Sequence, residues 1–191
     1  MTNPYHESET FDKIDFSKNP FQKGEYENCT FTNCIFANTD LSNAKFMDVE
    51  FTNCDLTMAK IMATGFQEVK FKDCKLLGLH FEHCNDFLFS VNFEGCNLNL
   101  ASFYQRKIKK TKFKDCTLVE TDFSETDLNM ATFAHCDLSG AIFDRTNLEE
   151  ADFRTSYNFT IDPEKNSLKK ARFSRLELSG LLDKYKLEIH D

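Results

Sequence analysis

Large apolar residues recur at every fifth position along most of the chain. Phe or Leu, and in places Ile or Tyr, fills the positions from Phe11 to Phe81, and after a slip of two the count resumes from Leu88 to Phe153. It misses at Asn158 and Pro163 and returns at Leu168, Phe173 and Leu178. Eighteen of the 21 Phe residues occupy these central positions. A period of five fits neither the 3.6-residue turn of an α-helix nor the two-residue alternation of a β-strand. The pattern therefore indicates an internal repeat, and the repeat dictates the fold.

A second, smaller position lies two residues before each central one. Between Cys29 and Ala151, 22 of these 25 positions hold Ala, Cys, Thr or Val, and the exceptions are Leu79, Asp86 and Arg106. The other three positions of each unit are mostly polar. We therefore expect one large and one small side chain of every unit to point into a core.

Units such as Ala141–Arg145 and Thr146–Glu150 resemble the pentapeptide-repeat family, whose unit is A(D/N)LXX with Phe often in place of Leu. The resemblance covers roughly residues 11–180. It implies an all-β fold, a right-handed quadrilateral β-helix in which four units make one square coil of 20 residues. The sequence supports that coil length independently, because residues 20 apart are alike once the slip is allowed for. The longest such column is Phe31, Phe51, Phe71, Phe93, Phe113, Phe133 and Phe153.

Departures from the period divide the chain. We expect an N-terminal cap at residues 1–10, a β-helix at 11–178, an insertion at 82–87, an irregular last coil at 154–167 and a capping or dimerisation segment at 179–191. Ser179 is a candidate N-cap of a short C-terminal helix. The apolar residues of this segment, which could cover the open core or pair with a second copy, are Leu181, Leu182, Tyr185, Leu187 and Ile189. In related proteins this segment forms the dimer interface, so the resemblance implies a homodimer.

The sequence contains no recognisable catalytic constellation. All eight Cys lie at the small inward positions, where reduced, buried thiols are expected; a zinc site or a disulfide framework is the alternative. His80, His83 and Cys84 form one local cluster, but the two imidazoles point outward and the thiol inward. Phosphate-binding loops and metal-ligand spacings are missing from the sequence. We therefore predict no catalytic residues, no metal, no cofactor and no enzymatic activity.

No signal peptide and no apolar run near 18 residues is present. The sequence therefore predicts a cytoplasmic protein without a membrane-spanning segment.

Charge carries the remaining functional signal. The net charge is −8, and ten acids against one base lie between Asp115 and Asp152, directly after a basic run from Arg106 to Lys114. An ordinary soluble surface is one interpretation. The other is a rigid acidic rod that offers a DNA-like field to the basic groove of a protein, without binding nucleic acid itself. The candidate partner-binding residues are Glu120, Asp122, Glu125, Asp127 and Asp144.

The closing segment, with Ala151-Asp152-Phe153, Ile161-Asp162-Pro163-Glu164 and Leu181-Leu182, resembles the Qnr quinolone-resistance and microcin-immunity subfamily. That resemblance implies a dimeric rod that binds a type II topoisomerase, DNA gyrase or topoisomerase IV, and protects it from quinolones or another poison. Gram-negative Qnr proteins carry two larger loops, whereas this chain has only the insertion at 82–87. The alternative function is a structural or scaffolding repeat protein with a target unrelated to DNA.

Overall fold

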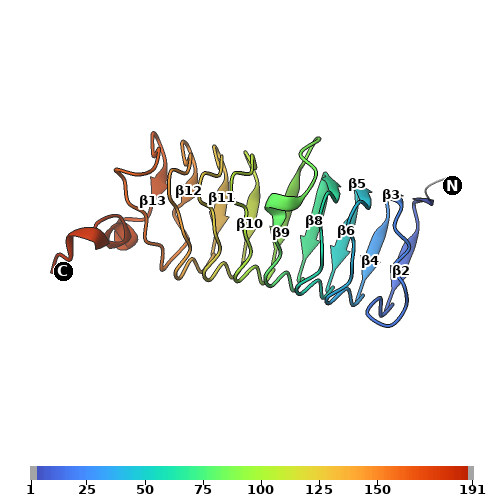
Figure 1. Cartoon of the computed structure of the whole chain (residues 1–191). Helices are drawn as coiled ribbons and strands as arrows, with labels where there is room; N and C mark the ends of the chain where they lie inside the picture. Colours follow the sequence, from blue (N-terminus) through green and yellow to red (C-terminus); the bar gives the residue numbers. More distant parts are fainter. Residues whose placement is uncertain (1–3, 189–191) are drawn as a thin grey trace.

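The molecule is a rod of stacked coils, with the two ends of the chain at opposite ends of the rod (Figure 1). The computed structural model describes residues 4–188. Most strands have only two or three residues, because each face of a coil accommodates one five-residue unit. The strands are β1 (Tyr5–Glu7), β2 (Thr10–Asp12), β3 (Glu25–Glu27), β4 (Thr30–Thr32), β5 (Lys45–Met47), β6 (Glu50–Thr52), β7 (Gly65–Gln67), β8 (Val69–Lys72), β9 (Val91–Glu94), β10 (Lys112–Lys114), β11 (Thr132–Ala134), β12 (Asp152–Phe153) and β13 (Arg172–Phe173). The 3₁₀ helices are η1 (Phe81–His83), η2 (Arg175–Leu181) and η3 (Asp183–Tyr185).

All strand pairing is parallel and joins successive coils. Strands β2, β4, β6 and β8–β13 form one nine-stranded sheet along the rod, and β1, β3, β5 and β7 form a second, four-stranded sheet. Phe31 pairs with Phe51 and Phe113 with Phe133, an offset of 20 residues in each case. The predicted fold, an all-β quadrilateral β-helix, is confirmed.

The core consists of aromatic and aliphatic columns that run along the rod axis. Within one column the rings of Phe113 and Phe133 stack with their centroids 4.9 Å apart and their planes 4° apart. Phe123 comes from the opposite face of the coil and meets Phe113 edge-on, at 5.9 Å and 82°. Offset stacks and edge-to-face contacts are the arrangements that aromatic pairs favour. The small residues two positions earlier, such as Ala131 and Cys136, are also fully buried, as predicted.

The corners of the coils adopt the left-handed backbone conformation. It recurs two residues after the central position, for example at Asn53 with φ 52° and at Leu100 with φ 58°. This conformation is costly for residues other than Gly, Asn and Asp. At each of these two corners the backbone N–H donates a hydrogen bond to the next coil, from Asn53 to the Lys72 carbonyl at 2.9 Å and from Leu100 to the Val119 carbonyl at 2.9 Å. The inter-coil hydrogen bonds therefore help to offset the strain of the corners.

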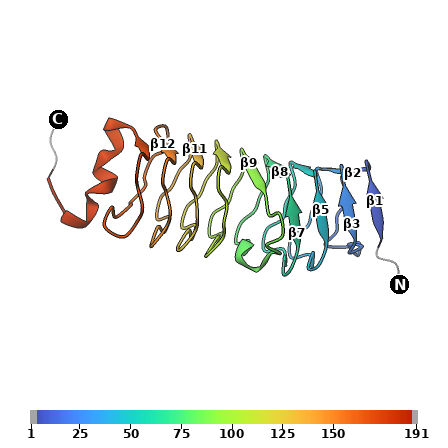
Figure 2. The same cartoon turned by 90° about the horizontal axis from the view of Figure 1, so that it is seen from above.

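The insertion lies between η1 and β9, where the regular outline of the rod is broken (Figures 1 and 2). The Asn85 N–H donates to the Thr64 carbonyl, an offset of 21 that also joins Gly65 to Ala44, whereas Val91 pairs with Val69 at an offset of 22 instead of 20. The two additional residues therefore lie between Asn85 and Val91.

The expectation that Leu88 resumes the inward positions is wrong. Leu88 is 65% exposed and has a φ of 53°. Phe89 packs against the core instead, with its ring 6.3 Å from that of Phe66 and 6.4 Å from that of Phe81. The count by fives cannot locate two extra residues within a loop, which explains the error.

The C-terminal end of the core is filled by residues that fall outside the five-residue period. Phe159 and Ile161 are buried, and the Phe159 ring lies 5.5 Å from that of Phe173. The helical segment beyond them is capped by Ser174, whose side chain accepts a hydrogen bond from the Leu176 N–H, and not by Ser179 as expected.

The first coil begins earlier in the chain than the sequence predicts. Strand β1 pairs with β3, so part of the segment expected as an N-terminal cap belongs to the first coil. Residues 1–3 of that cap and the predicted interface residue Ile189 lie outside the described residues. Within residues 4–188, no helix has the length and apolar character needed to cross a membrane.

The stacked core predicts large and local stability effects. Phe113→Ala and Phe133→Ala should each lower the free energy of unfolding by about 3–5 kcal/mol, because a fully buried ring leaves a cavity in a narrow core. Leu88→Ala is the control and should cost less than about 0.5 kcal/mol, as at ordinary surface positions. Urea denaturation followed by circular dichroism measures all three variants. A loss at Leu88 equal to the loss at Phe113 would contradict the register at the insertion.

Candidate partner-binding surface

The predicted acidic residues lie on two adjacent faces of the C-terminal coils. Glu120 and Glu125 occupy corners with φ 55°, so their side chains project from the edges of the rod. Asp122 lies between them on the face that carries Phe123, where its backbone pairs with Ser102 and Ile142 of the neighbouring coils. We call this the Phe123 face, and Asp144 belongs to the same face one coil further on.

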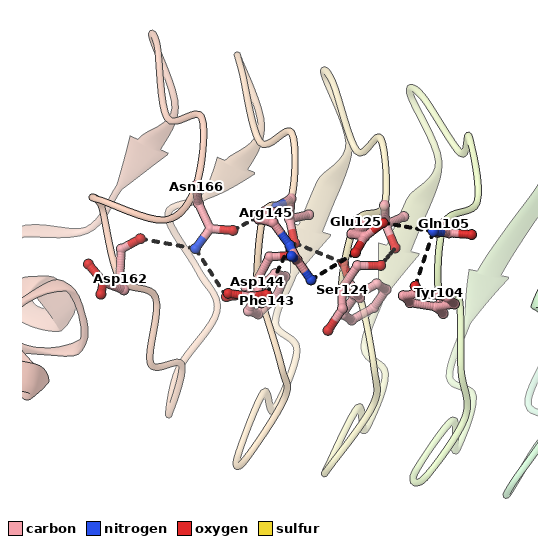
Figure 3. Close-up of polar contacts among 12 residues, drawn as sticks. Tyr104, Gln105, Ser124, Glu125, Phe143, Asp144, Arg145, Asp162 and Asn166 are labelled. Carbon is pink, nitrogen blue, oxygen red and sulfur yellow. Dashed lines mark hydrogen bonds and ion pairs between the residues drawn. The ribbon is translucent and has the colours of Figure 1, made fainter.

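Glu125 contacts groups on both neighbouring coils, and Asp144 pairs with the residue that follows it. Arg145 lies 2.8 Å from a Glu125 carboxylate oxygen and 3.2 Å from an Asp144 oxygen (Figure 3). On the other side, the Gln105 side-chain amide donates to the second Glu125 oxygen at 2.7 Å. Each ion pair is exposed and contributes about 0–1 kcal/mol. The Arg145 guanidinium nevertheless partly neutralises the charges of Glu125 and Asp144.

Asp127 lies on the adjacent face and is also paired. Lys109 of the preceding coil approaches one of its carboxylate oxygens to 3.1 Å, and the Asn147 amide of the next coil donates to the other at 2.9 Å. Glu120 and Asp122 form no ion pair with any residue from 4 to 188. The predicted set therefore divides into two acids without an ion pair among residues 4–188 and three, Glu125, Asp127 and Asp144, that are ion-paired.

The opposite face of the rod carries bases. We call it the Phe113 face, after the core residue at its centre. Lys70 and Lys72 of β8, and Lys112 and Lys114 of β10, line a shallow hollow there together with Glu50 and Glu94. Lys114 pairs with Glu94 at 2.7 Å. The bases of this hollow therefore lie on the face opposite Asp122, in the coils from Lys70 to Lys114.

The repeat pattern did not explain the role of Arg106. It fills a position that normally holds a small residue, and its side chain is only 5% exposed. Its guanidinium donates to the carbonyls of Cys84 at 3.1 Å and Asn85 at 3.3 Å, forms an ion pair with Asp86, and lies 4.1 Å from the centre of the Phe89 ring. These contacts hold the insertion in a defined shape. The sequence did contain a signal for this role, because Arg106 is a long cationic residue at a position that otherwise holds mostly Ala, Cys, Thr or Val.

The insertion presents an apolar tip. Phe87 and Leu88 are 69% and 65% exposed, respectively. The Phe87 N–H donates to the Asn85 side-chain oxygen at 2.8 Å, which tightens the turn that leads to the tip. Two adjacent exposed apolar side chains on a fixed loop are suited to contacts with another protein.

The cysteines and histidines follow the predicted orientations. All eight thiols are free and buried, and burial raises the pKa of the Cys84 thiol well above its usual range. His80 and His83 lie on the outside of the rod and are joined there by Glu82, which the sequence analysis did not include in the cluster. The absence of a metal and a cofactor, which the sequence predicts, stays a prediction.

The C-terminal segment docks on the last coil through a close backbone contact. A Cβ atom at Gly180 would lie 2.2 Å from the Phe159 carbonyl oxygen, so only glycine fits there. Lys184 lies 2.7 Å from both Asp162 and Glu164 and holds the pKa of each carboxyl below its usual range. Of the predicted interface residues, Leu181 packs against the core, while Tyr185 and Leu187 are more than half exposed. Leu176, which the sequence analysis did not select, is 89% exposed.

Comparisons with known proteins agree with the coil architecture. A family model described as a pentapeptide repeat region matches residues 7–81 and 86–158. No curated protein sequence matches the chain significantly.

Solved structures with the same fold are found. Two trypsin-treated variants of QnrB1, a plasmid-mediated fluoroquinolone resistance protein, match with TM-scores of 0.62 and 0.67 at 17% and 18% identity. The first match covers 98% of this chain and 100% of that one, and the second covers 100% and 93%. HetL, a pentapeptide repeat protein involved in heterocyst differentiation regulation from the cyanobacterium Nostoc sp. strain PCC 7120, matches with a TM-score of 0.59 at 14% identity, over 91% of this chain and 88% of that one. At these identities the likeness establishes the fold.

Because Arg106 is buried and Arg145 is exposed, we expect the loss of Arg106 to destabilise the protein more than the loss of Arg145. Arg106→Ala should lower the free energy of unfolding by about 1–3 kcal/mol, because it leaves loop carbonyls without a donor. It should also increase amide hydrogen exchange in residues 84–90. Arg145→Ala is the matched control and should cost less than about 1 kcal/mol, as an exposed ion pair does. Equal losses in denaturation, with unchanged exchange at the insertion, would show that Arg106 does not hold the loop.

Proposed function

The chain belongs to the pentapeptide-repeat family, and on that basis we propose that it is a non-catalytic β-helix that binds a type II topoisomerase. In this proposal the rod enters the basic DNA-binding groove of DNA gyrase or topoisomerase IV in place of DNA. It thereby protects the enzyme from quinolones or from another topoisomerase poison. The protein acts in the cytoplasm and does not itself bind nucleic acid.

The observation that carries the proposal is the acidic C-terminal half of a rigid rod. Ten carboxylates and one base lie between Asp115 and Asp152, and the coils fix their spacing along the axis. Acids on a firm scaffold produce a field that attracts a basic groove over distances of about a Debye length, or 8 Å at physiological ionic strength. The likeness in fold to a fluoroquinolone resistance protein selects the topoisomerase among basic partners.

The division of the acids refines the proposed contact surface. Glu125, Asp127 and Asp144 are engaged by Arg145, Lys109 or amides of adjacent coils, so their charge is partly compensated before a partner arrives. Glu120 and Asp122 carry the uncompensated charge of the predicted set. We therefore place the centre of the contact on the Phe123 face at these two residues, with Glu125, Asp127 and Asp144 around them.

Neutralising the two unpaired acids should slow association with gyrase several-fold and weaken its dependence on salt. The variant is Glu120→Gln with Asp122→Asn, which keeps an oxygen for the hydrogen bond that Asp122 accepts from the Ser124 N–H at 2.8 Å. Surface plasmon resonance at several salt concentrations measures the rate, and DNA supercoiling with and without ciprofloxacin measures protection.

The control for this experiment removes the same charge elsewhere. Asp48→Asn with Glu68→Gln changes two exposed corner acids of the N-terminal half, which form no ion pair among residues 4–188. Association should be nearly unchanged in this variant. Equal slowing in both variants would point to net charge alone, and no binding of the unmodified protein to gyrase would favour a scaffolding protein whose target is unrelated to DNA.

We further propose that two copies associate through the C-terminal segment. Besides Tyr185 and Leu187, the segment exposes Leu176 and Leu178, and an apolar end of a solenoid favours association with a second copy. Leu181 and Leu182 lie at the base of this surface and are partly buried.

Polar substitutions at the exposed positions should give a monomer. Leu176→Gln with Leu187→Gln leaves the Leu181 contact with the core intact, so the fold should persist while the molar mass in light scattering falls to that of one chain. Leu100→Gln, on the wall of the rod and 54% exposed, should leave the dimer unchanged. A monomeric unmodified chain at micromolar concentration would contradict the proposed dimer.

A further inference from the structure

The insertion brings two imidazoles and one carboxylate together on the outside of the rod. The ligand atoms of His80, Glu82 and His83 all lie within 4.8 Å of one another, and they form the one group of this kind in residues 4–188. His80 Nδ1 is 2.8 Å from a Glu82 carboxylate oxygen. The rings of His80 and His83 lie 5.8 Å apart, with their planes 21° apart.

The backbone of η1 produces this arrangement. His80 precedes the helix as its N-cap residue, and the His83 N–H donates to the His80 carbonyl at 3.2 Å. Side chains three residues apart in a 3₁₀ turn eclipse one another, so both imidazoles project from the same side. The Ala63 N–H donates to the His83 carbonyl at 2.7 Å and ties the turn to the preceding coil. The three side chains therefore stand on a fixed backbone.

The Glu82 carboxylate is incompletely satisfied. Its second oxygen, Oε2, is buried and has no hydrogen-bond partner among residues 4–188. The Glu82 side chain is 18% exposed, whereas that of His80 is 56% exposed. Leaving a buried acceptor of a charged group without a partner costs free energy. A cation held by the carboxylate and the imidazoles would compensate this buried charge.

We propose that His80, Glu82 and His83 form a binding site for a divalent transition-metal ion, of which zinc is the best match. Imidazole nitrogen and carboxylate oxygen bind zinc at about 2.0–2.2 Å, and a tetrahedron of that size separates its ligand atoms by about 3.3 Å. Their separations, at most 4.8 Å, need to shrink by no more than about 1.5 Å to reach it, and the His80 side chain is exposed. Two imidazoles favour zinc, copper or nickel over magnesium and calcium.

The surroundings leave the fourth ligand position open to solvent. His80 and His83 border a surface hollow that is also lined by Met58, Met62 and Lys60. Water can complete the coordination sphere from this hollow. Lys60 lines the same hollow and its positive charge opposes a cation there, so Lys60→Gln should tighten zinc binding.

A metal at this position would also stiffen the insertion. The three ligands lie at its N-terminal base, while Arg106 holds the carbonyls of Cys84 and Asn85 just beyond them. Because the ion would bind the folded chain and not the unfolded one, zinc should raise the melting temperature.

Calorimetric titration of the full chain, without a histidine tag, tests the site directly. The unmodified protein should bind one zinc ion per chain, and neither magnesium nor calcium should compete. His80→Gln, His83→Gln and Glu82→Gln should each weaken zinc binding more than about tenfold, at least as much as the loss of an outer-shell partner does. Zinc should raise the melting temperature of the unmodified chain and leave those of the three variants nearly unchanged.

His135→Asn is the matched control, since His135 is an exposed histidine on another part of the rod with the left-handed φ of 55° that asparagine tolerates. It should bind zinc like the unmodified chain. Cobalt should give visible absorption bands that zinc abolishes, and these bands should be missing from His83→Gln. An unmodified chain without saturable zinc binding would overturn the proposal, and so would binding that His80→Gln leaves unchanged. Loss in both histidine variants but not in Glu82→Gln would contradict a three-ligand site.

Discussion

Hydrogen bonds between successive coils are the interaction on which the rest of this structure depends. At the corners and along the sheets the N–H groups donate to carbonyls of the next or the preceding coil, at an offset of 19 or 21 residues, as from Asn53 to Lys72 and from Lys60 to Thr39. A single coil can neither pair its backbone N–H and C=O groups nor cover the apolar side chains at the two open sides of its core. The molecule is therefore stable only as a stack, and its stability is a sum of coil terms and nearest-neighbour terms.

The same stacking governs the surface. Residues 20 apart face outward at one place along adjacent coils, so charges meet partners from neighbouring turns, as Glu125 meets Gln105 and Arg145. A pentapeptide unit therefore does not set the charge of its own surface. The proposed contact surface is acidic at Glu120 and Asp122 because the coils on either side place no base beside them.

The insertion is the point at which this regularity is relaxed, and it is where unusual side chains gather. Two extra residues lie between Asn85 and Val91, and Arg106 donates hydrogen bonds from within the core to the carbonyls of Cys84 and Asn85 at the start of this loop. On the outside, the short turn that begins the insertion places Glu82 between two histidines. A break in a repeat thus creates both a clamp and a candidate ligand site within a few residues.

The sequence by itself determined the coil length, the inward columns and the nature of the core. A period of five with alternating large and small residues leaves few architectures, and an offset of 20 aligns Phe with Phe, as at Phe113 and Phe133, where an offset of 15 or 25 would mix Phe with Leu. It also located the acids. The tertiary structure decided which residues take over where the period fails, such as Phe89 for Leu88 and Phe159 for Asn158. It likewise decided that Arg106 lies inside and that Arg145 compensates Glu125. These outcomes depend on contacts between coils. The five-residue period of the sequence does not specify how a loop of irregular length packs against the adjacent coils.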